Sequence, residues 1–195
     1  MISKSANKFA IIMFDVGAIK QEEVDIYKYL FEYIIENLLF FFVFPFCGIL
    51  FGDILYGLLL YAVIIPLRSF GGGVHAPAKW ICNILSYGMV VVVIGVIPFA
   101  AKCLPKVMWL SIFVMSFLLI GCLVPVDCPN KRLSDDQKKK LKRYCLISLL
   151  LISIAFFIFY QFNIKSYCGI IAVGSLVIAV SDVLGVMVNR KEYIK

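Results

Sequence analysis

Cys82 and His75 are the two residues of this 195-residue chain whose chemistry and spacing point to catalysis. His75 is the only histidine, and Cys82 follows it by seven positions. A cysteine attacks a carbonyl carbon as the thiolate, so it needs a nearby base to take its proton near neutral pH. Histidine suits that role because its unperturbed pKa is about 6.5. We therefore take Cys82 as a candidate nucleophile and His75 as its candidate base.

The spacing of this pair limits how the two side chains can meet. In a continuous helix, residues seven positions apart share a face but lie about 10.5 Å apart along the axis, too far for a hydrogen bond. Proline is favoured in a first helical turn, so Pro77 predicts a helix that begins near residue 76 or 77 and leaves His75 outside it. Three glycines permit the turn that would fold His75 back over Cys82: Gly71, Gly72 and Gly73. The alternative, an interfacial histidine beside a cysteine that only packs, stays open.

The other cysteines are expected to be packing residues. They lie in or beside apolar segments, where free cysteine behaves as a small hydrophobic side chain: Cys47, Cys103, Cys122, Cys128, Cys145 and Cys168. No CxxC pair occurs, and Ala76 follows His75 where many metalloproteases have glutamate. With one histidine and scattered carboxylates, we expect no metal site and no other cofactor.

The composition excludes a soluble enzyme, a nucleic-acid-binding domain and a disordered chain. Apolar residues make up 63% and charged residues 16%, and the mean hydropathy is +0.98. In soluble domains about 45–50% of the residues are apolar and about 25% are charged. A chain this short cannot bury so much apolar surface. The net charge of +7 is typical of basic cytoplasmic loops in a membrane protein. We therefore expect an all-α integral membrane protein with no nucleic-acid partner.

Six apolar segments come near the ~20 residues that cross a bilayer. Gly52 and Asp53 divide the first long stretch, and its second part is short enough for either a tilted helix or half of a re-entrant hairpin. The segments are Ile34–Phe51, Ile54–Leu67, Ile81–Ala101, Val107–Val124, Tyr144–Phe162 and Tyr167–Val188. The sequence thus predicts one polytopic domain over residues 1–195, with membrane helices within residues 34–188.

Residues 1–33 precede these spans. Four apolar residues recur at helical spacing among charged ones: Val24, Tyr27, Phe31 and Ile34. This pattern fits an amphipathic helix lying on the inner leaflet, and it fits equally a solvated helix that leads into the first span.

Lysine and arginine set the expected orientation. If the N-terminus is inside, 16 of the 19 cations fall on the inner side, and only Lys102, Lys106 and Lys165 fall outside. The positive-inside rule then predicts a multi-pass protein of the cell membrane. Both termini, His75 and Cys82 are expected to be cytoplasmic.

Two segments of the chain resemble the accessory gene regulator B family, the membrane peptidases that mature peptide pheromones in Gram-positive quorum sensing. The first segment carries Arg68, Gly72-Gly73, His75-Ala76-Pro77 and Cys82. The second is a loop that precedes a basic stretch and reads Pro125-Val126-Asp127-Cys128-Pro129-Asn130-Lys131. Size, number of spans and the basic inner loop also agree, so the resemblance covers nearly the whole chain.

The resemblance implies a cysteine endopeptidase that acts on a small precursor peptide and works as a homodimer. Cys82 would attack a peptide bond, with His75 as the base, and release an acidic C-terminal tail. A thiol or hydroxyl of the same peptide would then resolve the acyl-enzyme and close a thiolactone or lactone ring. Arg68 and Gly73 match family positions around the site.

A basic loop over residues 125–143 is expected to face this substrate. It carries seven cations, among them Lys138, Lys139 and Lys140. These charges would attract an acidic peptide tail, or they follow the positive-inside rule and bind anionic lipids. Arg68 likewise either clamps a substrate carboxylate or anchors the end of its helix.

Two further questions stay open at the level of sequence. Asp182, inside the last apolar segment, and Asp127 are both candidates to orient His75, although a structural hydrogen bond is the alternative for Asp182. The competing function is a peptide transporter or membrane scaffold that binds an acidic peptide without cutting it. The glycine-rich turn before Cys82 would then be a gate.

Overall fold

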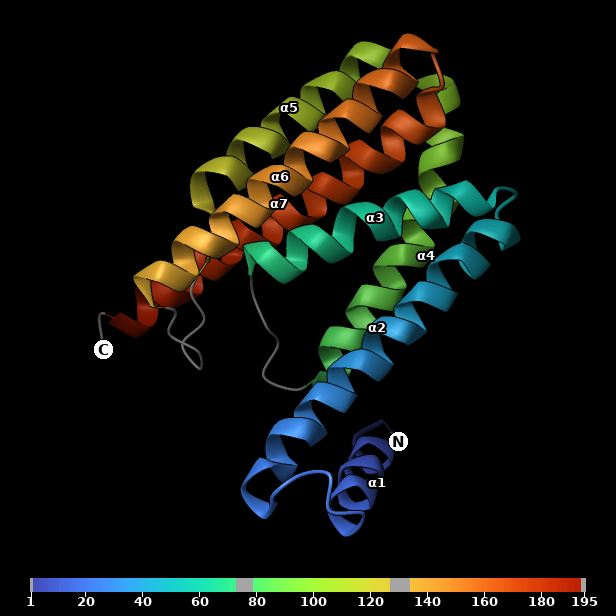
Figure 1. The fold of residues 1–195 in the computed structure, drawn as a ribbon. Coiled ribbons are helices and arrows are strands. Elements are labelled where there is room, and N and C mark those ends of the chain that lie inside the picture. The colour runs from blue at the N-terminus through green and yellow to red at the C-terminus, as the bar shows by residue number, and fades with distance from the viewer. Residues whose placement is uncertain (1, 73–78, 127–133, 194–195) are drawn as a thin grey trace. The chain divides into compact units, whose positions relative to one another are not determined.

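Helices make up the fold, and the described residues contain no strand. The computed structural model describes residues 2–72, 79–126 and 134–193, with side chains at 5–72, 84–126 and 134–188. The α-helices are α1 (Ile2–Asp15), α2 (Val24–Leu50), α3 (Ile54–Gly71), α4 (Lys79–Cys103), α5 (Lys106–Leu123), α6 (Asp135–Gln161) and α7 (Lys165–Tyr193) (Figure 1). A short 3-10 helix, η1 (Gln21–Glu23), lies directly before α2.

Six segments within these helices are long and apolar enough to cross a membrane. They are Gln21–Leu50, Ile54–Gly71, Ile84–Cys103, Lys106–Leu123, Asp135–Gln161 and Lys165–Val188. Their order and number match the apolar segments expected from the sequence. The prediction of an all-α, multi-pass membrane protein is confirmed.

The chain divides into two units, Met1–Phe44 and Pro45–Lys195. The division falls inside α2 at a proline, which cannot donate the backbone hydrogen bond of a helix. Within the first unit the rings of Phe9 on α1 and Phe31 on α2 lie 5.8 Å apart between centroids. Residues 24–34 form the first turns of α2, so the boundary expected near residue 33 lies inside a continuous helix.

A tight turn separates α2 from α3 at the predicted point. Gly52 has φ +102°, in the left-handed region that favours glycine. Asp53 caps α3, because its carboxylate accepts a hydrogen bond of 2.8 Å from the backbone N–H of Leu55. The helix continues beyond the expected Leu67 to Gly71, where Gly72 with φ +90° ends it. With 18 residues, α3 is longer than the sequence pattern indicated.

α7 is the central helix of the second unit. Half of its apolar window is buried, against at most a third in the other spans. It contacts α3, α4, α5 and α6. Two glycines let these neighbours approach closely: a Cβ added at Gly174 would lie 2.9 Å from Leu60 Cδ1, and one added at Gly169 would lie 2.7 Å from Ile97 Cγ2. Small residues serve this purpose where membrane helices pack.

α3 and α7 lie side by side and run in the same direction (Figure 1). Near their first residues, the Tyr167 hydroxyl donates a hydrogen bond of 2.5 Å to the carboxylate of Asp53. Near their last turns, the Asp182 carboxylate lies 3.8 Å from the position that a Gly71 Cβ would occupy. The register of α3 on α7 is therefore defined at both ends.

The close packing of α3 on α7 predicts a difference between two glycines. Gly174→Val should lower the free energy of unfolding by about 1–3 kcal/mol, because the added atoms collide with Leu60 and Val63 in a packed interface. Gly121→Val on α5 is the matched control, since an added Cβ there meets no atom within 4 Å. Denaturant titration of both variants in detergent measures the difference. Equal losses at the two positions would contradict the assigned packing.

Candidate active site

The two predicted catalytic residues fall at the edge of the described structure. His75 and Gly73 lie outside the described residues, as does Asp127. Cys82 is the fourth residue of α4 as described from Lys79, and its side chain also lies outside the described part. Its backbone position near the helix N-terminus places it where the helix dipole modestly favours a thiolate.

Arg68 connects the end of α3 to the helix that carries Cys82. Its Nη1 donates a hydrogen bond of 3.1 Å to the Ser86 hydroxyl on α4. Ser86 follows Cys82 by four residues, so the two positions lie one helical turn apart on one face of α4. The guanidinium therefore lies along the face on which Cys82 is placed. The same hydrogen bond ties α3 to α4, as the anchoring alternative for Arg68 requires.

The two sequence motifs meet where α3 ends. The backbone N–H of Val126 donates a hydrogen bond of 2.8 Å to the carbonyl of Gly71. A Cβ added at Gly72 would lie 2.5 Å from the carbonyl oxygen of Val126. Gly72 leads into the segment that carries His75, and Val126 leads into the one that carries Asp127. The structure thus joins the starting points of both segments.

Asp182 on α7 lies at this junction. Its exposed fraction is 0%, and neither carboxylate oxygen has a hydrogen-bond partner among the described residues. It adjoins Gly71 on α3, since a Cβ added at that glycine would lie 3.8 Å from its carboxylate. The sequence offered one signal for this residue, namely a carboxylate inside an apolar segment. An ionisable side chain inside a membrane span is energetically costly and is usually retained for a function.

The cations expected in a loop lie mainly on a helix. Ser134 and Gln137 form a capping box that starts α6 at Asp135, with side chain to backbone hydrogen bonds of 3.4 and 3.1 Å. Lys138, Lys139 and Lys140 therefore lie in the first two turns of α6, and the last two are exposed. Cations at a helix N-terminus gain nothing from the helix dipole. The helix dipole therefore does not account for these cations, and an anionic partner and the positive-inside rule both stay open as explanations.

The start of α6 lies beside the end of α3. The rings of Phe70 and Tyr144 are 5.5 Å apart between centroids. The contact places the basic turns of α6 at the same end of the bundle as Gly71 and Asp182. The sequence did not predict the contact between Phe70 and Tyr144, because no local pattern indicates which aromatic residues of two distant segments will pack together.

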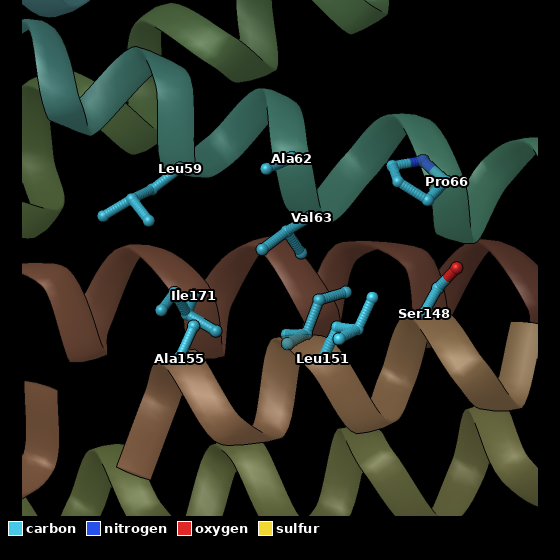
Figure 2. Close-up of a pocket in the computed structure, with 9 residues that line it drawn as sticks. Leu59, Ala62, Val63, Pro66, Ser148, Leu151, Ala155 and Ile171 are labelled. Atoms are coloured by element: carbon cyan, nitrogen blue, oxygen red, sulfur yellow. The ribbon is translucent and has the colours of Figure 1, made fainter. Parts of the chain in front are cut away.

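An apolar groove of about 250 Å³ lies between α3 and α6, with α7 at its base. Figure 2 shows its lining, in which the Ser148 hydroxyl is the one side-chain polar group. That hydroxyl hydrogen-bonds the backbone carbonyl of Tyr144 at 3.0 Å. The groove therefore offers hydrocarbon-like surface and no group for acid–base chemistry. In the described part of the chain, no group of three or more His, Cys, Asp or Glu residues is placed to hold a metal ion.

Five of the other cysteines lie in the described part of the chain and none of these forms a disulfide, whereas Cys128 lies outside that part. Cys47, Cys145 and Cys168 are buried and free, as expected for packing residues, whereas Cys103 and Cys122 are free and exposed.

A comparison with protein families gives one match, to accessory gene regulator B over residues 5–181. No curated protein and no solved structure matches the chain significantly. The matched residues include both motifs, all of α2 to α6 and most of α1 and α7, although the match ends one residue before Asp182. A match of this length implies a part in the processing of quorum-sensing peptides. The chain belongs to the accessory gene regulator B family.

Proposed function

We propose that this protein is a membrane cysteine endopeptidase that removes the C-terminal tail of a small precursor peptide and closes the remainder into a ring. The observation that carries the proposal is the hydrogen bond between Arg68 and Ser86. This hydrogen bond connects Arg68 to the face of α4 that carries Cys82, which lies one helical turn before Ser86. Family membership supports the same assignment.

In the first step the Cys82 thiol loses its proton to His75, and the thiolate attacks the carbonyl carbon of the scissile peptide bond. The bond to nitrogen breaks, and His75 returns the proton to the leaving amine. The tail departs with a new amino terminus. The rest of the peptide stays on Cys82 as a thioester.

In the second step a thiol or hydroxyl of the same peptide attacks the thioester carbonyl. The Cys82 sulfur leaves and regains a proton, and the peptide closes as a thiolactone or lactone. A thioester conserves acyl-transfer energy that hydrolysis would discard, so ring closure requires no cofactor. The reaction does require that water be kept away from the thioester.

The basic turns of α6 are the proposed contact for an acidic tail. Lys139 and Lys140 are exposed at the end of the bundle where α3 terminates. Positive charge there raises the local concentration of an anionic substrate and speeds its capture. The same charges suit anionic lipid headgroups, so both partners belong to the proposal. A homodimer is proposed on family grounds alone.

The first prediction concerns the nucleophile and its base. In membrane vesicles with the precursor peptide, Cys82→Ala and His75→Ala should abolish tail release measured by mass spectrometry. Cys82→Ser should be nearly as inactive, because a hydroxyl is far harder to deprotonate than a thiol. The exposed free cysteines provide matched controls, and Cys103→Ala and Cys122→Ala should retain activity. Binding of the precursor with no tail release by the unmodified protein would instead indicate a transporter or scaffold.

A second prediction concerns substrate capture. Changing Lys138, Lys139 and Lys140 together to glutamine should raise KM more than it lowers kcat, and should flatten the dependence of kcat/KM on salt. The matched control removes three cations from the other end of the bundle: Lys102, Lys106 and Lys165. An unchanged KM and salt response in the α6 variant would leave these lysines a role in topology alone.

A third prediction concerns orientation. From the charge distribution we propose that the ends of α3, α5 and α7 and the starts of α4 and α6 face the cytoplasm. In single-cysteine variants of intact cells, position 82 should resist a membrane-impermeant thiol reagent, whereas Cys103 should react from outside. Labelling of position 82 from outside would contradict both the orientation and a cytoplasmic site.

A further inference from the structure

The apolar groove between α3 and α6 is a surface whose occupant follows from its surroundings. Its lining comes from three helices, with Ile171 of α7 at the base (Figure 2). The groove opens to the outside, because Leu151 on the α6 wall is 61% exposed and Ala62 on the α3 wall is also exposed. Both walls lie in segments that are long and apolar enough to cross a membrane. An occupant of the groove therefore comes from the bilayer or from a chain embedded in it.

The lining favours an occupant that has no polar groups. Among the described residues that form it, Ser148 alone has a polar side chain, and its hydroxyl already donates to the backbone carbonyl of Tyr144. An extended peptide in the groove would find no side-chain donor for its own carbonyl groups, and leaving these groups unpaired is costly. A hydrocarbon chain carries no such groups, and it gains dispersion contacts with every apolar atom that it touches.

One stripe of α6 leads from the groove to the basic end of that helix. Ala155, Leu151 and Ser148 line the groove, and the stripe continues at the same helical spacing through Tyr144 to Lys140. At 1.5 Å per residue, Tyr144 lies about 6 Å beyond Ser148 along the helix axis, and Lys140 lies about 12 Å beyond it. The groove, an aromatic residue and a cation thus follow one another along one face of α6.

This order matches the order of layers in a membrane leaflet. Beyond the hydrocarbon core, the polar region of each leaflet is about 5–8 Å thick. Tyr144 is 43% exposed and packs on Phe70 at the end of α3, at the boundary position that tyrosine favours in membrane proteins. Lys140 is exposed one turn further along α6, at the depth expected for lipid headgroups.

Positive charge dominates α6 beyond this boundary. Between Asp135 and Arg143 the helix carries five cations and two carboxylates. Basic residues clustered at the end of a membrane helix attract anionic headgroups. A phospholipid whose acyl chain lies in the groove would hold its phosphate beside these cations, so the apolar surface and the charge select the same molecule.

We propose that the groove and Lys140 form a binding site for one anionic phospholipid. An acyl chain lies between α3 and α6, and the headgroup phosphate pairs with the Lys140 ammonium. The bound chain fills the space between the two helices and so supports the position of α3. The inference rests on the part of the proposed function that assigns anionic lipid to the α6 cations, and it requires neither Cys82 nor a substrate.

The test uses the full-length protein in phosphatidylcholine vesicles that contain a trace of phosphatidylglycerol with a photoreactive diazirine in its acyl chain. After illumination, mass spectrometry should find the crosslinks concentrated on residues that line the groove. Replacing part of the phosphatidylcholine by unlabelled phosphatidylglycerol should lower these crosslinks several-fold. Crosslinks spread evenly over the exposed faces of all spans would overturn the inference.

Matched variants test the acyl-chain site. Ala155→Phe fills the groove and should lower crosslinking there several-fold, whereas Ile154→Phe, which adds a ring to an exposed neighbour outside the lining, should not. Ala62→Phe fills the groove from the opposite wall and provides a second variant if the first does not fold. Unchanged crosslinking in a groove-filling variant that keeps its Tm would overturn the inference.

A second pair of variants tests the headgroup contact. Lys140→Gln should remove the preference for labelled phosphatidylglycerol over phosphatidylcholine that carries the same label. Lys139→Gln is the matched control and should keep that preference, because its position is turned by about 100° from Lys140 around the helix. Equal losses in the two variants would overturn the assignment of Lys140.

Other occupants of the groove would leave different signatures. If Ala155→Phe changed the oligomeric state and left the lipid crosslinks unchanged, the groove would be an interface between copies of this chain. If the precursor peptide displaced the labelled lipid and unlabelled phosphatidylglycerol did not, the groove would be a peptide site. Either result would overturn the inference. Failure of the proposed peptidase is read separately, as tail release by Cys82→Ala.

Discussion

The packing of α3 against α7 is the contact on which the candidate site depends. Gly174 allows Leu60 and Val63 to approach α7 closely, and the hydrogen bond from Tyr167 to Asp53 defines the register at one end. Given that register, the last turn of α3 arrives beside Asp182. A shift of α3 by one turn would move it about 5.4 Å and separate these groups. The chemistry at one end of the bundle is thus positioned by contacts along its whole length.

The bilayer explains why so few polar groups serve this site. Surfaces that face lipid must be apolar, so most exposed side chains of the spans are leucine, isoleucine, valine and phenylalanine. Polar and charged groups are confined to helix ends and to the interior, where each one has a cost. The cations on the first turns of α6 occupy such an end, and Asp182 occupies the interior.

The sequence predicted what depends on local pattern. The six spans, the division at Gly52 and Asp53 and the buried free cysteines follow from hydropathy and from turn residues. The extension of α3 to Gly71 and the start of α6 at Asp135 were missed, because the charged residues near both points resemble loop. The hydrogen bonds of Arg68 with Ser86 and of Val126 with Gly71 join residues far apart in the chain, and no local signal indicates such partners. The pairing of His75 with Cys82 stays a prediction, as does their orientation in the membrane.

The central claim is that the substrate becomes attached to Cys82, and trapping that attachment tests it most directly. A precursor whose ring-closing residue is alanine can acylate the enzyme but cannot cyclise, so the thioester should accumulate. Mass spectrometry should find the peptide without its tail on the fragment that contains Cys82, and hydroxylamine should remove it. An adduct on another of the seven cysteines, or tail release by a protein whose Cys82 is alanine, would contradict the account.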